Sequence, residues 1–256
     1  MNRLDELFLR KKNKILNVYC TAGYPQLHST LEVMKALQES GADIIELGMP
    51  YSDPLADGPV IQHSGSTALA NGMTIEKLFG QLQDFRKQVY VPVILMGYMN
   101  PVLQYGFEKF CQHAAALPID ALILPDLPEH EFETEYGPVM QRYGLDFIFL
   151  VTPETSEERV KKLDQLSTGF LYAVSSSSTT GSEKNMTDVN AYLKRLQSYN
   201  LKNPVLVGFG IKDKQSFDDA CTYANGAIIG TAFIKALENS ADVAGATAVF
   251  IKSILS

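Results

Sequence analysis

The amino-acid sequence predicts a (β/α)8 TIM barrel formed by a single domain over residues 1–256. Short apolar segments alternate with amphipathic segments along the whole chain, and no linker rich in Pro, Gly or Ser interrupts them. Eight such pairs in 256 residues leave about 32 residues for each pair, which matches a barrel of roughly 250 residues. The alternative is a doubly wound open sheet. That fold favours a dinucleotide-type glycine signature after the first strand, and Thr21-Ala-Gly-Tyr-Pro is not one.

Segments that are apolar throughout are typical of parallel strands covered on both faces. The expected strands are residues 15–21, 43–48, 92–98, 119–124, 145–151, 169–174, 204–208 and 227–230. The expected helices between them are residues 27–40, 74–88, 107–117, 129–143, 156–166, 188–199 and 213–224. A short extra amphipathic helix is expected within residues 1–14, and a further helix begins directly after Gly230-Thr231.

Several strands share a weak internal repeat at their amino ends. Asp43, Asp120 and Asp146 each lead into a strand, and Asn225 is a polar variant of the same position. The amino ends of barrel strands lie at the bottom face, opposite the face that carries barrel chemistry. We therefore expect these side chains to be solvated structural features.

Composition excludes several classes of protein. A formal net charge of −7 without a block of basic residues argues against binding to nucleic acid or an anionic membrane. The three cysteines are far apart and form no CxxC pair, so we expect no disulfide framework and a cytoplasmic location. No apolar run approaches the ~18 residues of a membrane span, and residues 1–14 lack the apolar core of a signal peptide.

The expected strands contain no Lys, Arg or His. A Schiff-base aldolase needs a strand-borne lysine, so the sequence argues against that chemistry. The histidines fall on helices or loops at unrelated spacings, which argues against a metal site. We expect surface or helix-packing roles for His28, His63, His113 and His130.

Glu46 is an unusual carboxylate within an expected strand. In Ile44-Ile45-Glu46-Leu47-Gly48, alternation places Ile44, Glu46 and Gly48 on one face. If that face is the barrel interior, burial without a strand-borne cation raises the pKa of Glu46 toward neutrality. Such a group can both give and take a proton. The alternative is a structural Glu hydrogen-bonded to backbone or loop amides.

The loop at residues 49–59 follows this strand and carries Asp53 and Asp57. Its three prolines limit the freedom of its backbone. The aspartates either cap turns or bring a second carboxylate over the pocket. Two carboxylates in different environments are a usual means of acid/base chemistry without a metal.

Glycines end the last two strands, at Gly208-Phe-Gly210 and at Gly230-Thr231. Barrels often hold a phosphate between these two loops, at the N-terminus of a short helix. We expect a phosphate site made of backbone amides, with Gly181 as a further donor; plain loop geometry is the alternative. The polar stretch 175–181 is either an active-site lid or a flexible loop.

Together these residues resemble the tryptophan synthase alpha subunit family over nearly the whole chain. The most specific segment is Glu46-Leu-Gly-Met-Pro50-Tyr-Ser-Asp53-Pro-Leu-Ala-Asp57-Gly-Pro59-Val-Ile-Gln62, and Asp126-Leu-Pro128, Gly208-Phe-Gly210-Ile and Gly230-Thr-Ala also fit. The resemblance implies a lyase of tryptophan biosynthesis that cleaves indole-3-glycerol phosphate to indole and glyceraldehyde 3-phosphate. It also implies an α2β2 complex in which indole passes to a beta subunit. No cofactor or metal is expected in this chain, because pyridoxal phosphate belongs to the beta subunit.

The resemblance further implies a role for each matching residue. Glu46 is the general acid/base, and Asp57 binds the indole N–H and stabilises the cationic indolenine. The residues expected to line the indole site are Tyr19, Met96, Ile123, Tyr172, Phe209 and Ile228. The residues expected to hold the phosphate are Gly181, Gly208, Gly210, Gly230 and Thr231. Thr180 matches the lid threonine that meets the loop aspartate on closure, and Pro50 and Asp53 match part of the surface that faces the beta subunit.

The lid departs from the family pattern. Ser176 and Ser178 stand where the family usually has an arginine and a glycine, and Thr179 replaces a usual valine. Lid closure and its coupling to the beta subunit are therefore open. Three functions remain: a lyase subunit of a complex, a stand-alone lyase that releases free indole, and a non-catalytic phosphate-binding barrel. The pair of Glu46 and Asp57 argues against the third, because a pure binder gains little from an interior carboxylate.

Overall fold

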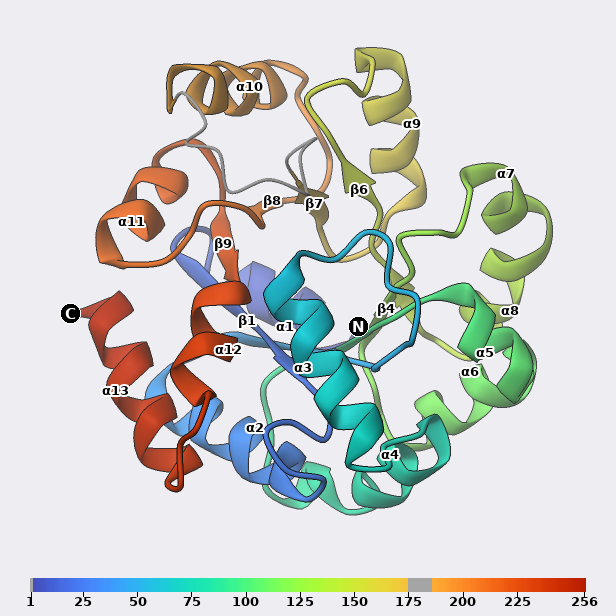
Figure 1. The fold of residues 1–256 in the computed structure, drawn as a ribbon. Helices are drawn as coiled ribbons and strands as arrows, with labels where there is room; N and C mark the ends of the chain where they lie inside the picture. Colours follow the sequence, from blue (N-terminus) through green and yellow to red (C-terminus); the bar gives the residue numbers. More distant parts are fainter. Residues whose placement is uncertain (1, 175–185) are drawn as a thin grey trace.

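A computed structural model describes residues 2–174 and 186–256, with the side chains of residues 186–189 left aside. Its strands form one sheet in the order β5-β4-β3-β2-β1-β9-β8-β7-β6. Every neighbouring pair is parallel. The helices form a ring around the strands, as Figure 1 shows. The expected barrel architecture is thus present.

The strands lie where the apolar segments predict them. They are β1 (Ile15–Thr21), β2 (Ile44–Gly48), β3 (Val93–Met96), β4 (Ala121–Ile123), β5 (Asp146–Phe147), β6 (Leu150–Val151), β7 (Leu171–Ala173), β8 (Val205–Val207) and β9 (Gly226–Ile229). The helices before β4 are α1 (Arg3–Arg10), α2 (Ser29–Ser40), α3 (Pro59–Ala70), α4 (Ile75–Gln81), the 3-10 helix η1 (Phe85–Lys87), α5 (Met99–Tyr105) and α6 (Phe107–Ala116). Those after β4 are α7 (Glu129–Glu131), the π-helix η2 (Phe132–Tyr136), α8 (Gly137–Arg142), α9 (Glu157–Leu166), α10 (Met186–Ser198), α11 (Lys214–Tyr223), α12 (Thr231–Leu237) and α13 (Val243–Leu255). Among the described helices, none is long and apolar enough to cross a membrane.

The fifth strand of the barrel is interrupted. The sequence predicts one strand over residues 145–151, but the structure has β5 and β6 with two residues between them. β5 pairs with β4, whereas β6 pairs with β7. The backbone N–H of Ile148 still donates to Leu122 O at 3.1 Å, and that of Tyr172 donates to Phe149 O at 3.0 Å. The two halves together therefore close the sheet into a barrel of eight strands.

The inner layer of the barrel is apolar and is plugged at one end by α1. The inner cluster includes Ile44, Ile94 and Leu206 from three different strands, and Ile148 from the break between β5 and β6. Leu4, Leu7 and Phe8 of α1 belong to the same cluster, and the rings of Phe8 and Phe170 lie 6.1 Å apart. In Figure 1, α1 is drawn fainter behind the strands, whereas α3 lies across the near end. The plug leaves the opposite end, where the carboxyl ends of the strands lie, as the open end of the barrel.

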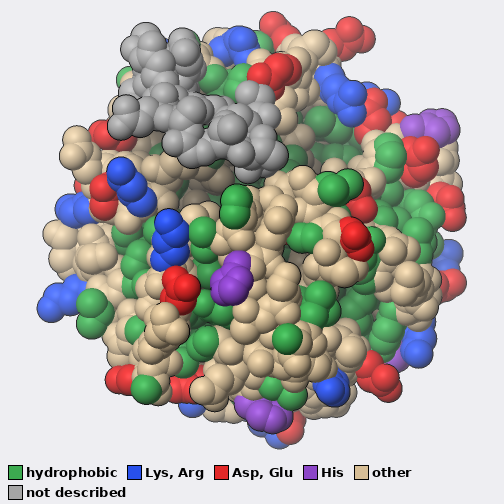
Figure 2. All heavy atoms as spheres, in the orientation of Figure 1, with side chains coloured by type: hydrophobic (Ala, Val, Ile, Leu, Met, Phe, Trp, Pro, Cys, Tyr) green, Lys and Arg blue, Asp and Glu red, His purple; other side chains and the backbone are tan. Residues whose placement is uncertain are grey.

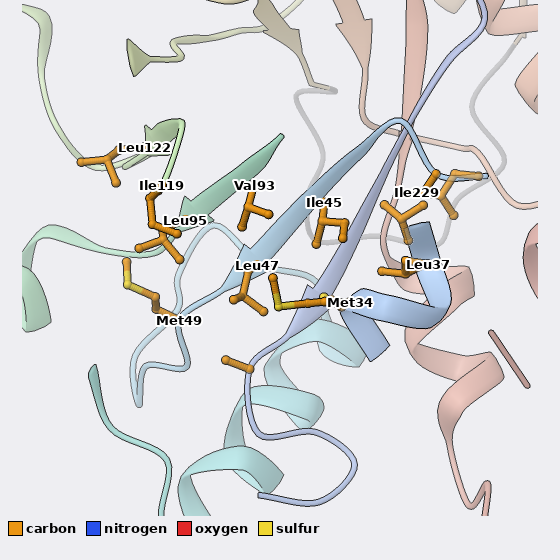
Figure 3. Packing of buried hydrophobic residues seen from close by; sticks show 14 of the residues in the cluster. Met34, Leu37, Ile45, Leu47, Met49, Val93, Leu95, Ile119, Leu122 and Ile229 are labelled. Atoms are coloured by element: carbon orange, nitrogen blue, oxygen red, sulfur yellow. The ribbon is translucent and has the colours of Figure 1, made fainter. Parts of the chain in front are cut away.

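The outer layer packs the strands against the helices. Alternation turns Ile45 and Leu47 of β2 outward, where they join the cluster that contains Met34 and Leu37 of α2. Figure 3 shows these side chains between the strands and α2. Because β2 is covered on both faces, Glu46 has no route to solvent through the wall of the barrel; its side chain is 0% exposed.

The polar residues at the amino ends of the strands have a common structural role. Asp43, Asp120 and Asn225 each accept a hydrogen bond from a backbone N–H of the neighbouring strand, at 2.8–2.9 Å. The expected solvation is wrong for Asp120, whose side chain is 1% exposed and forms ion pairs with Arg3 and Arg86. The sequence pattern alone could not show that two arginines, from α1 and η1, converge on one carboxylate.

Candidate active site

Glu46 lies inside the barrel, as alternation along β2 predicts. It is paired in register with Tyr19 of β1 and Ile94 of β3, and its side chain is fully buried. The inward-facing neighbour one step earlier on β2, Ile44, belongs to the inner apolar cluster. Gly48, one step later, ends the strand. Glu46 therefore lies near the open end of an otherwise apolar interior.

The surroundings of Glu46 favour its neutral form. Burial raises its pKa to about 8, the hydrogen bond from Asn17 opposes the rise, and the nearby Asp57 carboxylate adds to it. Asn17 Nδ2 donates to Glu46 Oε2 at 2.9 Å, while Glu46 Oε1 has no partner among the described residues. At pH 7 a carboxyl group with this pKa holds its proton for most of the time. It is therefore able to donate a proton to a substrate.

Asp57 is the second carboxylate of the site, in the loop after β2. Its side chain is half-buried, and burial raises its pKa to about 6. A side-chain hydrogen bond with Tyr98 lowers the pKa and so opposes part of this rise. The loop is held in place by Tyr98, which lies between β3 and α5. The Ala56 N–H donates to Tyr98 Oη at 3.2 Å, and the Tyr51 and Tyr98 rings lie 5.5 Å apart. At neutral pH Asp57 is mainly ionised, so it accepts hydrogen bonds and favours positive charge nearby.

Two glycines make room for two tyrosine rings at the open end. A Cβ at Gly48 would lie 2.1 Å from Tyr19 Oη, and a Cβ at Gly208 would lie 1.9 Å from a ring carbon of Tyr172. Both tyrosines therefore project across neighbouring strands into the interior. Burial raises the pKa of both hydroxyls well above the ordinary value, so they are neutral.

The structure brings most of the expected indole-site residues together. Tyr172, Ile123 and Ile228 belong to the inner cluster, and Met96 packs against it. Tyr19 and Phe209 pack against the outer cluster instead, and the ring of Phe209 lies 6.5 Å from that of Tyr192 on α10. Thr180 and Gly181 lie outside the described residues, as do the serines of the expected lid. Their expected roles stay predictions.

The residues expected to hold phosphate lie at the ends of two adjacent strands. β8 pairs with β9, so Gly208 and Gly230 directly follow neighbouring strands. Gly210 has φ +70°, and no described residue lies within 4 Å of a Cβ position there. Gly230 is the N-cap of α12 and has no side chain with which to cap the first turn of that helix. The free N–H groups of this turn, with Thr231 first, are available to an anion.

Asn17 is the site residue that sequence reasoning missed. Period-two alternation along Ile15–Thr21 turns Asn17 to the same face as Tyr19, so the pattern contained the signal. An Asn within an otherwise apolar run is a polar group that needs a partner inside the barrel. Glu46 is the partner.

The histidines have the expected peripheral places. His28, His63 and His130 are exposed, and His113 shares a 2.7 Å hydrogen bond with Tyr105 on the outer face. Within the described part of the chain, no group of three or more His, Cys, Asp or Glu side chains could hold a metal ion. Figure 2 shows that most charged side chains of the open end lie toward its rim.

Comparison with known proteins identifies the family. Residues 6–252 match the model of the family described as tryptophan synthase alpha chain. The tryptophan synthase alpha chain of Flavobacterium johnsoniae is 51% identical over 241 residues, which cover 94% of this chain and 95% of the relative. That of Christiangramia forsetii is 49% identical over 256 residues, which cover 99% and 98%.

Solved structures agree with this match. Tryptophan synthase subunit alpha from Legionella pneumophila has a TM-score of 0.90 at 37% identity, with 99% of this chain and 97% of that chain covered. A chain of tryptophan synthase from M. tuberculosis in its aminoacrylate-bound form has a TM-score of 0.87 at 30% identity, with 99% and 98% covered. The matched region includes Glu46, Asp57 and the glycines of β8 and β9.

Proposed function

Because the chain belongs to the tryptophan synthase alpha chain family, whose members are lyases that cleave indole-3-glycerol phosphate, we propose that Glu46 and Asp57 perform the acid/base chemistry of this cleavage. The products are indole and glyceraldehyde 3-phosphate. The observation that carries the assignment is the Glu46 carboxyl group, which is fully buried in an apolar interior and has one oxygen without a described partner. A buried carboxyl group with an unsatisfied oxygen lowers the stability of the fold, so its presence indicates a role in proton exchange.

The reaction divides between the two carboxyl groups. Glu46 begins protonated and gives its proton to ring carbon C3 of the indole, which becomes a cationic indolenine. Asp57, ionised, accepts the hydrogen bond of the ring N–H and stabilises the positive charge. Glu46, now a carboxylate, takes the proton of the hydroxyl on the adjacent glycerol carbon. That carbon becomes the aldehyde, the carbon–carbon bond breaks, and its electron pair returns to the ring to form indole.

Backbone amides at the ends of β8 and β9 hold the phosphate group. Gly208, Gly210, Gly230 and Thr231 supply close approach and free N–H groups at one edge of the open end. Tyr172, Met96, Ile123 and Ile228, in or against the inner cluster, surround the indole ring together with Tyr19, whose hydroxyl lies beside Gly48. Fixing the substrate at both ends places C3 within reach of Glu46, and such positioning supplies much of the rate.

The test of this function is the Glu46→Gln variant. Glutamine keeps the shape of the side chain but cannot exchange a proton, so indole formation falls by at least roughly 10²–10⁴-fold. The matched control is Glu157→Gln on α9, where a carboxylate that is 53% exposed loses its charge and the rate stays unchanged. Near wild-type turnover of Glu46→Gln with an unchanged circular dichroism spectrum contradicts the assignment.

The chain acts as the alpha subunit of a complex with a beta subunit, in an α2β2 arrangement and in the cytoplasm. Leu55 supports an interface at the loop after β2, because its side chain is 88% exposed between Asp53 and Asp57. The three cysteines are free and buried, which suits a reducing compartment. The chain needs no cofactor of its own, and pyridoxal phosphate resides in the beta subunit.

An indole-release assay of the pure chain, with and without the beta subunit, separates this function from the alternatives. Large stimulation by the beta subunit supports the complex. Fast turnover of the chain alone indicates a stand-alone lyase. No turnover under either condition indicates a barrel that only binds.

A further inference from the structure

Asn17 is a second polar side chain inside the barrel, directly beside Glu46. It lies on β1 and is fully buried. Asn17 Nδ2 donates to Glu46 Oε2 at 2.9 Å, so the bond joins two adjacent strands within the inner layer. Both partners project from strands rather than from loops, which fixes their backbones.

This hydrogen bond gives the two oxygens of the Glu46 carboxyl group different surroundings. Oε2 is engaged by Asn17, whereas Oε1 is buried and has no partner among the described residues. A carboxyl group with a purely structural role usually has both oxygens satisfied when it is buried. The unpartnered oxygen is therefore the one left to bond a substrate atom.

We propose that Asn17 is a positioning residue for the acid/base step: it holds Oε2 of Glu46, fixes the plane of the carboxyl group and leaves Oε1 to exchange the proton with the substrate. This inference rests on the proposed role of Glu46. The proton leaves Oε1 for the indole C3 and returns to it from the glycerol hydroxyl, so the carboxyl group does not need to rotate between the two steps.

The charges around Glu46 give Asn17 a second effect. Asp57, from the loop after β2, favours the neutral form of Glu46. The other titratable groups that interact with it are Tyr19 and Cys20 of β1 and Tyr172 of β7, and the pKa of each is raised by burial, so all three are neutral. Among the described groups that act on Glu46, Asn17 alone favours the charged form. Asn17 therefore keeps the proton transferable at neutral pH.

The experiment compares Asn17→Val with wild type in indole formation over pH 5–10. Valine removes the donor and suits a buried strand. We expect the alkaline limb of kcat/KM to move up by about one pH unit, because the hydrogen bond to the charged form is lost. We also expect kcat to fall by about tenfold, because the carboxyl group is no longer held in one orientation. Asn17→Ser, with a shorter donor, shifts the limb in the same direction by less.

The matched control is Thr247→Val, which removes another fully buried hydrogen-bonding side chain, on α13, and leaves kcat and the alkaline limb unchanged. If kcat/KM of Asn17→Val and Asn17→Ser falls at the same alkaline pH as that of wild type, Asn17 is only structural and the inference is wrong, whatever the kcat of the two variants. If Asn17→Val does not fold, the limb of Asn17→Ser decides. An active Glu46→Gln variant would instead overturn the proposed function, so the two failures are distinguishable.

Discussion

Glu46 and Asp57 are two carboxyl groups with opposite protonation at neutral pH. Burial raises both pKa values, to about 8 for Glu46 and to about 6 for Asp57. The difference follows from exposure, because Glu46 is enclosed by the barrel whereas Asp57 lies in a loop and is half-buried. A proton donor and a hydrogen-bond acceptor therefore coexist in the site between pH 6 and pH 8.

We predict a bell-shaped dependence of kcat/KM on pH. Below about pH 6 Asp57 gains a proton and no longer stabilises the indolenine cation. Above about pH 8 Glu46 loses the proton that it must donate. Activity therefore falls on both sides of a maximum near neutrality. Steady-state kinetics over pH 5–10 checks the prediction.

The Asp57→Asn variant tests whether Asp57 causes the fall in kcat/KM at low pH. The variant should lose the limb near pH 6 and lose more in kcat than in KM, because the charge acts on the transition state. A phosphate monoester also titrates at about pH 6. An acid limb that persists in Asp57→Asn therefore belongs to the substrate phosphate, and a change in KM alone makes Asp57 a binding residue.

At the scale of elements, the proposed phosphate site lies at the ends of β8 and β9 and the start of α12. We predict that Gly210→Val and Gly230→Val weaken the binding of glycerol 3-phosphate more than Lys235→Ala does. Added side chains block close approach to the backbone, whereas Lys235 lies a turn into α12 and is exposed. The measurement is the Kd for glycerol 3-phosphate by calorimetry.

Gly230→Val is the cleaner of the two glycine variants. Gly210 has φ +70°, so valine there strains the backbone as well. Gly230 has φ −119°, and its Cβ would make only ordinary contact with Tyr19. If Lys235→Ala loses more affinity than Gly230→Val, the phosphate is held by side chains rather than by amides.

The elements that the sequence predicts are those with a strong apolar pattern. All eight barrel strands match apolar runs, because a strand covered on both faces is apolar throughout. The apolar pattern does not predict α3, α5 and α13. In α3 the buried residues are small, namely Ser64, Gly65 and Ala68, so no apolar stripe marks the helix. The break between β5 and β6 was also not predictable, since it depends on which neighbours each half pairs with.

The candidate site, like the fold, is predictable only in part from the sequence. Alternation along β2 predicts the inward direction of Glu46, and the absence of strand cations predicts the direction of its pKa shift. The partnership of Asn17 with Glu46 depends on the relative register of β1 and β2, in which Tyr19 lies beside Glu46. Register between strands that are far apart in the chain is set by packing, and a single sequence does not contain it in readable form.

For the whole molecule, the buried Glu46 lowers stability as pH rises. The folded protein keeps the proton up to about pH 8, while the unfolded chain releases it near the ordinary value of 4.5. Between these values the unfolded state binds fewer protons, so the free energy of unfolding falls with rising pH, by about 3 kcal/mol between pH 5 and pH 8. Glu46→Gln, which does not titrate, is therefore more stable than wild type at pH 8, and by a smaller margin at pH 5. Urea unfolding at both pH values checks this, and equal margins contradict it.

Side-chain hydroxyls complete the closure of the barrel at the interrupted strand. The N–H of Phe147 donates to Thr168 Oγ1 at 2.9 Å, and that of Phe149 donates to Ser167 Oγ at 3.0 Å. Ser167 is fully buried. We predict that Ser167→Ala lowers the free energy of unfolding by about 1–3 kcal/mol, because it leaves the buried N–H of Phe149 without an acceptor. Thermal unfolding of Ser167→Ala against the exposed Ser198→Ala measures the difference, and equal melting temperatures contradict the prediction.

The interrupted strand also sets where the barrel is weakest as a continuous structure. β1 and β2 share five residue pairs, whereas β4 with β5, β6 with β7 and β8 with β9 share two each. Only the first two of these short ladders flank a break within a strand, so we expect local opening between β4 and β7 to precede global unfolding. Amide hydrogen exchange at Ile148 and Tyr172 should thus be faster than at Val18 and Leu47. The break lies on the part of the wall that carries Tyr172, so the same opening would admit solvent to the proposed indole site while Glu46, on the better-paired strands, keeps its place.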